Sequence, residues 1–228
     1  MDARNFGFSL LEVAIVLIII GLLLITVIPS LNILIEFRRF DETKNKLVLI
    51  QDALINFAVL NKKLPCPATL NSGGLGNNNQ DGTCPNGYYG YIPAADLGLN
   101  ETNNQGLVVD AWGRPIKYAV TQKNSYAYTL SDGVKNNINN NLKPDLSICA
   151  SYLTGSSTCF NSQTIIKNVP AVIYSSGKNG IFESYLNDNS TTFLYHEPTA
   201  KDSPLGEFDD QVLWISNSNL IGRMAQTW

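Results

Sequence analysis

An uninterrupted apolar run dominates the first part of the chain. From Phe8 to Ile28 the only charged side chain is that of Glu12, and residues 1–7 form a short polar leader before the run. A helix that crosses a lipid bilayer needs about 20 mostly apolar residues. The pattern therefore predicts a membrane-spanning helix that carries one carboxylate near its start.

The hydrophobic pattern changes after residue 30. Apolar side chains now recur at intervals of three or four, with charged and polar residues between them, which is typical of an amphipathic helix; they are Phe40, Leu47, Ile50, Leu54 and Phe57. Pro65 and Pro67 end this second helical pattern, because proline breaks an α-helix. Pro29 lies inside the combined helical stretch. We expect it to kink or loosen the helix, since its missing N–H removes one backbone hydrogen bond.

The rest of the chain alternates short apolar runs with turn signals. Residues 116–120 and 126–130 place apolar or aromatic side chains at alternate positions, which predicts an antiparallel hairpin. A last short helix is expected to begin at a cap formed by Asn217 or Ser218. Further strands are expected at 169–174, 193–195 and 212–215. Together these patterns indicate an α+β domain.

The four cysteines indicate disulfide bonds. No C-x-x-C pair occurs and the chain has one histidine, so the usual spacings of zinc sites are missing. Disulfides are typical of exported domains. Four cysteines permit three connectivities, and we favour Cys66–Cys84 with Cys149–Cys159, because each pair closes a local loop rich in glycine or serine. The alternative is four free, buried thiols.

Residues 131–164, which contain the second cysteine pair, hold turn signals and an asparagine-rich tract at 136–141. Such a composition is typical of loops. We therefore expect an insertion on the surface of the domain.

The leader junction resembles that of a known family. The residues Gly-Phe-Ser-Leu-Leu-Glu at 7–12 are similar to the class III leader junction of type IV pilins and type II secretion pseudopilins. The resemblance implies that a membrane peptidase cuts after Gly7 and methylates the new N-terminus on Phe8. Many family members also carry proline at the position of Pro29. The turn at 110–115, Asp-Ala-Trp-Gly-Arg-Pro, resembles the entry to the first strand of pseudopilin globular domains.

Glu12 is expected to set the register of the subunit in a fibre, as the resemblance also implies. It has no obvious charged partner in its own helix, whereas the N-terminal amine on Phe8 of a neighbouring subunit can come alongside. Removing one partner of a buried ion pair costs ~3–5 kcal/mol. The pair would therefore favour one position of the neighbouring helix over the others.

The resemblance implies how the chain is divided into segments. The segments are a leader at 1–7, the transmembrane half of a long helix at 8–29, its amphipathic half at 30–63 and an extracytoplasmic domain at 64–228. The expected fold is α+β and pilin-like, with the long N-terminal helix packed on an antiparallel β-sheet and with disulfide-closed loops. The subunit would cross the bacterial inner membrane once, with its C-terminal domain in the periplasm, and the assembled fibre would be periplasmic or extracellular.

The partners implied are other pilin or pseudopilin subunits, the prepilin peptidase and the inner-membrane assembly platform. Arg38 and Arg39 follow the apolar run whereas Arg4 alone precedes it. The resemblance and not the charge pattern therefore decides the orientation. The long cysteine-free tail after Cys159 and the size of the domain differ from a typical major subunit, and both favour a minor one.

Catalytic chemistry is sparse in this chain. The run Ser-Ser-Gly-Lys at 175–178 fails the phosphate-loop pattern, no G-x-S-x-G elbow occurs, and His196 is the one histidine. We expect no enzymatic activity. Clustered carboxylates are the ligand type that calcium takes, and the chain offers Glu207, Asp209 and Asp210 as candidates. They form no recognisable ligand pattern, so we assign no metal and no cofactor.

Two alternatives to a purely structural subunit follow from the same features. The first is a pilus-borne adhesin or DNA-uptake pilin that binds its ligand through the disulfide loops. The formal net charge of −3 disfavours nucleic acid as a partner. The second alternative is a membrane-anchored enzyme, which the missing nucleophile–base and metal constellations disfavour.

Overall fold

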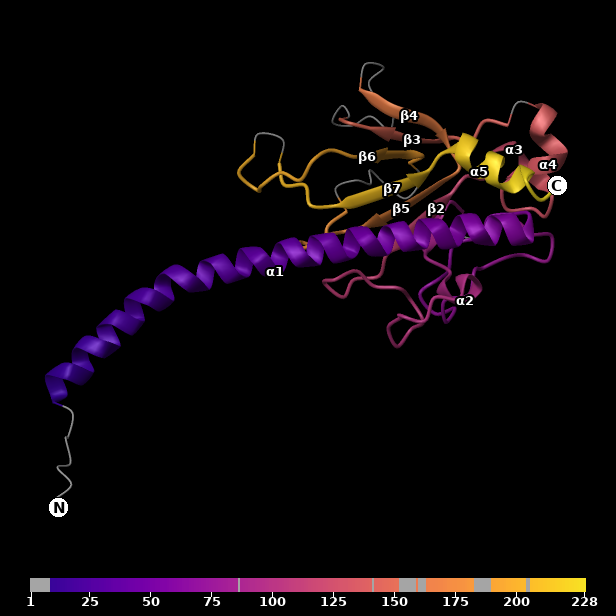
Figure 1. Ribbon diagram of the computed structural model, residues 1–228. Coiled ribbons are helices and arrows are strands. Elements are labelled where there is room, and N and C mark those ends of the chain that lie inside the picture. The colour runs from indigo at the N-terminus through magenta and orange to yellow at the C-terminus, as the bar shows by residue number, and fades with distance from the viewer. Residues whose placement is uncertain are drawn as a thin grey trace. The chain divides into compact units, whose positions relative to one another are not determined.

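The computed structural model describes residues 9–228 except 86, 141, 152–158, 160–162, 183–189 and 204–205, and it describes no side chains at 24–31 and 140. The chain divides into two compact units, Met1–Asp41 and Glu42–Trp228, and each is described by itself. The elements follow one another as α1 Leu10–Asn61, β1 Tyr89–Tyr91, α2 Ala94–Leu97, β2 Lys117–Val120, α3 Lys123–Tyr126, α4 Gly133–Asn137, η1 Ile138–Asn140, β3 Leu146–Cys149, β4 Thr164–Val169, β5 Ala171–Ser175, β6 Thr192–Leu194, β7 Gln211–Ile215 and α5 Asn217–Ala225 (Figure 1).

Helix α1 begins at a serine cap. Ser9 Oγ accepts a hydrogen bond of 3.3 Å from the N–H of Leu11, and this bond satisfies one of the N–H groups that lack a partner in the first turn. The backbone of α1 is helical at Pro29 and on both sides of it. The side chain of Pro29 lies outside the described residues.

The prediction that the first half of this helix spans a membrane is wrong. In the part of the chain that the structure describes, no helix combines the length and the apolar character that a membrane crossing requires. The longest helical stretch with backbone and side chains both described is about 30 residues, 32–61, and charged residues interrupt it.

The prediction of one antiparallel sheet is also wrong, because the strands form two sheets. The first has four antiparallel strands in the order β1-β2-β5-β7, and the second has three in the order β4-β3-β6. Within the second sheet β3 pairs with β6 in parallel and with β4 in antiparallel fashion. Its central strand β3 comes from residues 131–164, the range expected to be a surface insertion, and Leu146 and Ile148 on β3 are fully buried.

The expected hairpin between 116–120 and 126–130 does not form. Strand β2 pairs with β1 and β5 instead, and the second run belongs partly to the short helix α3. Asn124, Ser125 and Tyr126 have left-handed backbone conformations, which turn the chain away from an extended path. Tyr128 is then buried in the core, where its hydroxyl donates a hydrogen bond of 2.6 Å to Asn217 Oδ1.

The distal part of α1 packs on the first sheet, as its periodicity predicts. Leu47, Ile50 and Leu54 are buried in one cluster with Tyr118 of β2 and Ile173 of β5. A second cluster lies between the two sheets and includes side chains of β3, β5 and β6, namely Ile148, Tyr174 and Phe193. The domain therefore has a helix, a four-stranded sheet and a three-stranded sheet stacked around two apolar layers.

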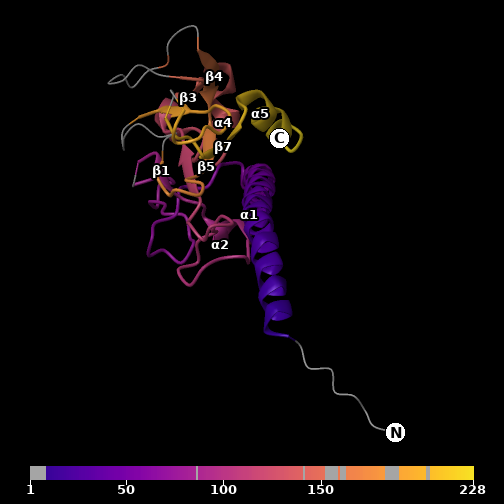
Figure 2. The same ribbon diagram turned by 90° about the vertical axis from the view of Figure 1, so that its left-hand side faces the viewer.

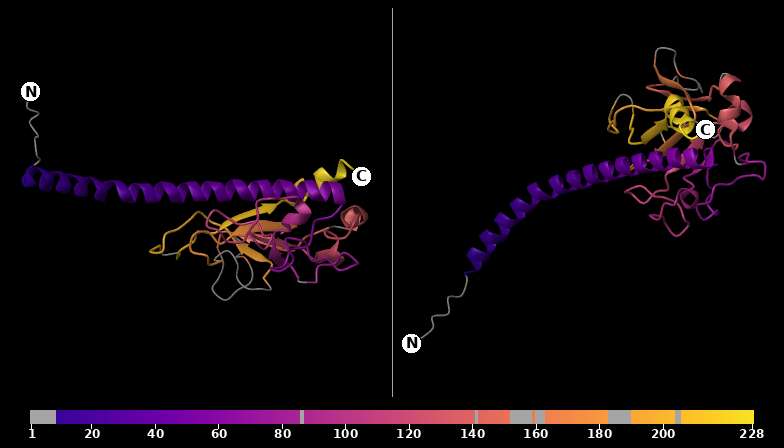
Figure 3. Two further views of the ribbon diagram at one scale, coloured as in Figure 1. Left: turned by 90° about the horizontal axis from the view of Figure 1, so that it is seen from below. Right: turned by 45° about the vertical axis from the view of Figure 1, so that its right-hand side comes forward.

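The last three predicted strands and the last helix are confirmed as β5, β6, β7 and α5. The cap of α5 is one residue earlier than expected, since Ser216 Oγ accepts the N–H of Asn219 at 3.3 Å. Figures 2 and 3 show α5, in yellow, beside the C-terminal end of α1. There Lys62 Nζ donates a hydrogen bond of 2.7 Å to the carbonyl oxygen of Thr227, which ties the end of the chain to the end of α1.

Candidate functional site

The first part of α1 carries an apolar surface. Of the residues from 10 to 23, all the large apolar ones are exposed in the single chain, and Leu10 is 91% exposed. We call this set the N-terminal apolar surface: Leu10, Leu11, Val13, Ile15, Val16, Leu17, Ile18, Ile19, Ile20, Leu22 and Leu23. Contiguous exposed apolar area of this kind marks a site that lipid or protein covers.

Glu12 is the one acidic residue in the first turn of α1. Its side chain is exposed, and it makes no ion pair within the described residues. The predicted cleavage site at Gly7 and the predicted methylation site at Phe8 lie outside the described residues. The roles of Gly7, Phe8 and Glu12 therefore stay predictions.

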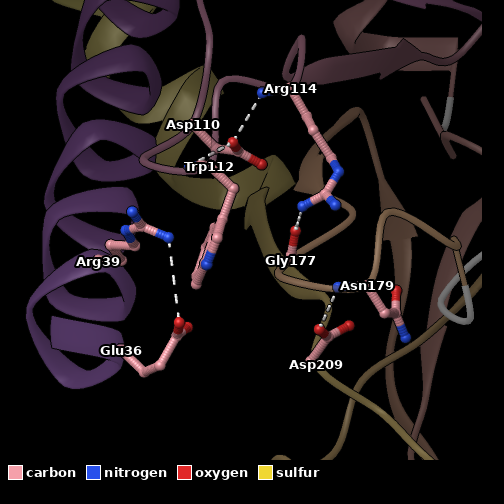
Figure 4. Close-up of polar contacts among 8 residues, drawn as sticks. All are labelled: Glu36, Arg39, Asp110, Trp112, Arg114, Gly177, Asn179 and Asp209. Carbon is pink, nitrogen blue, oxygen red and sulfur yellow. Dashed lines mark hydrogen bonds and ion pairs between the residues drawn. The ribbon is translucent and has the colours of Figure 1, made fainter. Parts of the chain in front are cut away.

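Further along α1 the exposed side chains become mixed in character. Ile33, Leu34, Ile35 and Phe37 are still exposed, and charged residues follow them. Arg39 Nη1 lies 3.9 Å from Glu36 Oε1 on the same helix (Figure 4). An exposed pair of this type contributes little to stability.

The two predicted disulfides are confirmed. Cys66–Cys84 and Cys149–Cys159 have Cα–Cα separations of 5.5 Å each. Cys66 and Cys84 are both buried in the main core, so the loop between them is anchored at each end to the body of the domain. The described part of the chain holds no free cysteine.

The turn at 110–115 is organised by the carboxylate of Asp110. Asp110 Oδ1 accepts hydrogen bonds of 2.9 Å from the N–H groups of Trp112 and Arg114. Asp110 Oδ2 accepts one of 2.7 Å from Ser175 Oγ at the end of β5. Asp110 is 3% exposed, so this carboxylate is buried and bonded at both oxygens. Figure 4 shows its place in the turn.

The same turn contacts the loop that follows β5. Arg114 Nη1 donates a hydrogen bond to the carbonyl oxygen of Gly177 (Figure 4). Gly180 has a positive φ of 78°, a left-handed backbone conformation that favours glycine, and it lies close to the Arg114 guanidinium. The run at 175–178 thus serves as a turn in a structural network, which agrees with its failure to match a phosphate loop.

The acidic residues considered for calcium do not form a metal site in the described part of the chain, where no group of three or more metal-ligating side chains lies together. Glu207 is exposed and Asp210 is buried. Asp209 Oδ2 accepts a hydrogen bond of 2.8 Å from the N–H of Asn179 (Figure 4). Asp209 therefore fixes the 177–180 loop.

His196 has a packing role. Its ring lies 4.0 Å from the ring of Phe208, measured between centroids, and its Nδ1 lies 2.7 Å from the carbonyl oxygen of Glu197. These contacts hold two loop segments together and need no catalytic partner.

One polar cluster was not predicted from the sequence. The hydroxyl of Tyr88 donates a hydrogen bond of 2.6 Å to Asp145 Oδ2, and Thr121 Oγ1 donates one of 2.6 Å to Asp145 Oδ1. Burial, together with the neighbouring Asp145 carboxylate, raises the pKa of Tyr88 well above its ordinary value. The three residues are far apart in the chain, so no local sequence spacing predicts the cluster. The cluster anchors the segment before β3 to the first sheet.

Comparisons with protein-family models, with curated proteins and with solved structures found no match.

Proposed function

We propose that this chain is a structural subunit of a type IV pilus or of a type II secretion pseudopilus. In this proposal a prepilin peptidase cuts the precursor after Gly7 and methylates Phe8, and the mature subunit then joins other pilin or pseudopilin subunits through its N-terminal helix. The leader residues at 7–12 suggest the family, and the N-terminal apolar surface is the structural observation that supports the proposal most.

The energetics of that surface favour assembly. Each large apolar side chain that becomes fully buried contributes about 1.5–3 kcal/mol, and eleven such residues are exposed on the N-terminal apolar surface. Their burial between the helices of neighbouring subunits would offset the entropy lost on association. A surface of this composition is unfavourable in water, so an isolated subunit would be stored at the bacterial inner membrane.

Two further observations support an exported, non-catalytic subunit. Both disulfides join residues close in sequence, and disulfides persist in oxidising compartments such as the periplasm. The buried polar side chains described above hold turns and loops together. The disulfides support a C-terminal domain that lies outside the cytoplasm.

The test is to isolate sheared surface fibres or secretion pseudopili from a host that produces the full chain, and to sequence the N-terminus of the subunit by mass spectrometry. A mature chain that begins at methylated Phe8 and co-purifies with the fibre is the expected result. A host lacking the prepilin peptidase is the control, and there the chain should keep residues 1–7. A chain with an intact leader in the peptidase-positive host, or one missing from every fibre fraction, would contradict the proposal.

A further inference from the structure

A polar hollow lies between the distal part of α1 and α5. It has a volume of about 270 Å³ and is lined by Asp52, Ile55, Asn56, Asn219 and Arg223. Ile55 is buried and forms the apolar part of the lining, whereas the other four side chains are exposed. The hollow therefore presents one carboxylate, one guanidinium and two amides to whatever covers it.

The hollow holds two opposite charges, those of Asp52 and Arg223. Neither Asp52 nor Arg223 takes part in an ion pair or hydrogen bond within the described residues. Leu49, 64% exposed, and Leu60, 80% exposed, flank the hollow on α1. They lie three positions before Asp52 and four after Asn56, which places them on the same side of the helix. Unpaired charges between two exposed leucines make this a surface suited to a partner with both apolar and charged side chains.

The chain itself carries a surface with the complementary charges. Arg38 and Asp41 are exposed on α1, and neither takes part in an ion pair or hydrogen bond within the described residues. Leu34 and Phe37 are exposed beside them, Phe37 by 65%. The spacing of three or four places all four residues on one side of the helix. The charges are one cation and one anion, as in the hollow.

We propose that the hollow is the docking site for a second copy of this chain, which inserts its Arg38 and Asp41. Arg38 of one copy pairs with Asp52 of the next, and Asp41 pairs with Arg223. Leu34 and Phe37 pack beside Leu49. This inference rests on the proposed function, because it describes how neighbouring subunits contact each other within a fibre.

The geometry of this contact suits an open fibre. The two surfaces lie at different places on the chain, so the contact is heterologous and can repeat without closing. Arg38 and Asp52 are 14 positions apart along the chain, so the two surfaces do not overlap. Because the pairs are charged and solvent-accessible at the edge of the contact, they select the register more than they add affinity.

The test is charge reversal in the full chain, produced in a fibre-forming host in place of the native copy. Arg38→Asp alone and Asp52→Arg alone should each lower the amount of subunit in the fibre roughly three- to tenfold, because like charges then face each other. The double variant should return to within about twofold of the unmodified chain, since the pair is restored with exchanged signs. Asp41→Arg and Arg223→Asp should behave in the same way.

Matched controls are available on the same domain. Lys201→Asp and Asp202→Arg make the same charge changes at exposed positions outside both surfaces, and they should leave the amount in the fibre unchanged. A second readout separates contacts between copies from contacts within one copy. Co-production of the Arg38→Asp chain with the Asp52→Arg chain should restore assembly, since each variant then meets its complement.

Equal amounts of all variants in the fibre would overturn the inference and leave the proposed function standing. Loss of assembly in single and double variants alike, without rescue on co-production, would also overturn it, because the charges would then act within one chain. If the unmodified chain itself never entered a fibre, the proposed function would fail and this inference with it.

Discussion

Ser175 Oγ donates a hydrogen bond of 2.7 Å to Asp110 Oδ2, although the two residues are 65 positions apart in the chain. Asp110 begins the turn that leads into β2, and Ser175 ends β5. Because β2 and β5 are neighbours in the first sheet, the bond joins the turn to the strand against which β2 pairs. The N–H of Ala111 in the same turn donates a hydrogen bond of 3.1 Å to Thr43 Oγ1 on α1.

Replacing Asp110 should destabilise the domain. In Asp110→Ala the N–H groups of Trp112 and Arg114 and the hydroxyl of Ser175 lose their acceptor. An unsatisfied buried donor costs about 1–3 kcal/mol, so we expect a loss of about 2–4 kcal/mol in the free energy of unfolding. Urea unfolding in detergent, followed by tryptophan fluorescence, measures it. Asp202→Ala at an exposed site is the control, and equal midpoints for the two variants would contradict this role of Asp110.

The two disulfides should differ slightly in their contribution. In the chain-entropy model a bond closing a loop of about 15 residues stabilises by roughly 3 kcal/mol, with more for longer loops. The separations here are 18 residues for Cys66–Cys84 and 10 for Cys149–Cys159. The variant with Cys66→Ser and Cys84→Ser should therefore melt below the one with Cys149→Ser and Cys159→Ser. Calorimetry of the two variants in the same buffer decides the order, and the reverse order would refute it.

Alkaline pH should destabilise the domain through buried tyrosines. Burial raises the pKa of Tyr118 far above its ordinary value, and its hydroxyl donates a hydrogen bond of 3.2 Å to the carbonyl oxygen of Pro65. The raised pKa means that the folded chain keeps its proton where the unfolded chain releases it. The stabilisation is complete below pH ~10, the ordinary pKa of tyrosine, and is lost progressively above it.

Tyr118→Phe removes this titrating group and should reduce the fall in stability between pH 9 and pH 11. Tyr128 also has a pKa that burial raises, so part of the pH dependence should remain in the variant. Urea midpoints across this pH range measure the effect. An identical pH dependence in the variant and the unmodified chain would exclude Tyr118 as a source.

Cleavage of the leader should depend on Gly7 if the proposed function is right. Gly7→Ala adds a methyl group where the peptidase is expected to cut, and we expect the precursor to accumulate at the expense of the mature chain. Immunoblots that resolve the loss of residues 1–7 make the comparison, with Ala3→Gly within the leader as the control. Normal processing of Gly7→Ala would count against a class III leader.

Glu12 should be needed for assembly and not for production of the chain. Glu12→Ala removes the carboxylate proposed to pair with the amine of Phe8 in a neighbouring subunit, and breaking a buried pair costs ~3–5 kcal/mol. We expect cleaved subunit in the membrane fraction and at least a tenfold loss of subunit from the fibre. The full cost of breaking a buried pair would lower the amount of subunit in the fibre even further. Glu12→Gln tests whether the charge matters. Normal incorporation of both variants would exclude the register role.

Several features of this protein follow from the sequence alone because their physical causes are local. The interval of three to four residues between Leu47, Ile50 and Leu54 defines the buried side of α1, since a helix brings such positions to one face. The cysteines closest in sequence form the disulfides, because short polar loops bring their ends together. The runs at 169–174 and 212–215 become β5 and β7, because apolar segments of this length bounded by turn signals suit buried strands.

The tertiary structure decided the features that depend on contacts between distant residues. The alternation of aromatic and other side chains at Tyr126 and Tyr128 is compatible with a strand. However, residues 124–126 have left-handed backbone conformations and Tyr128 is buried in the core, so this segment forms no strand. The second sheet and its parallel β3–β6 pair join segments that carry no local signal of each other. The bond between Ser175 and Asp110, and the hollow between α1 and α5, likewise exist only once the chain is packed, because each needs side chains that the sequence keeps far apart.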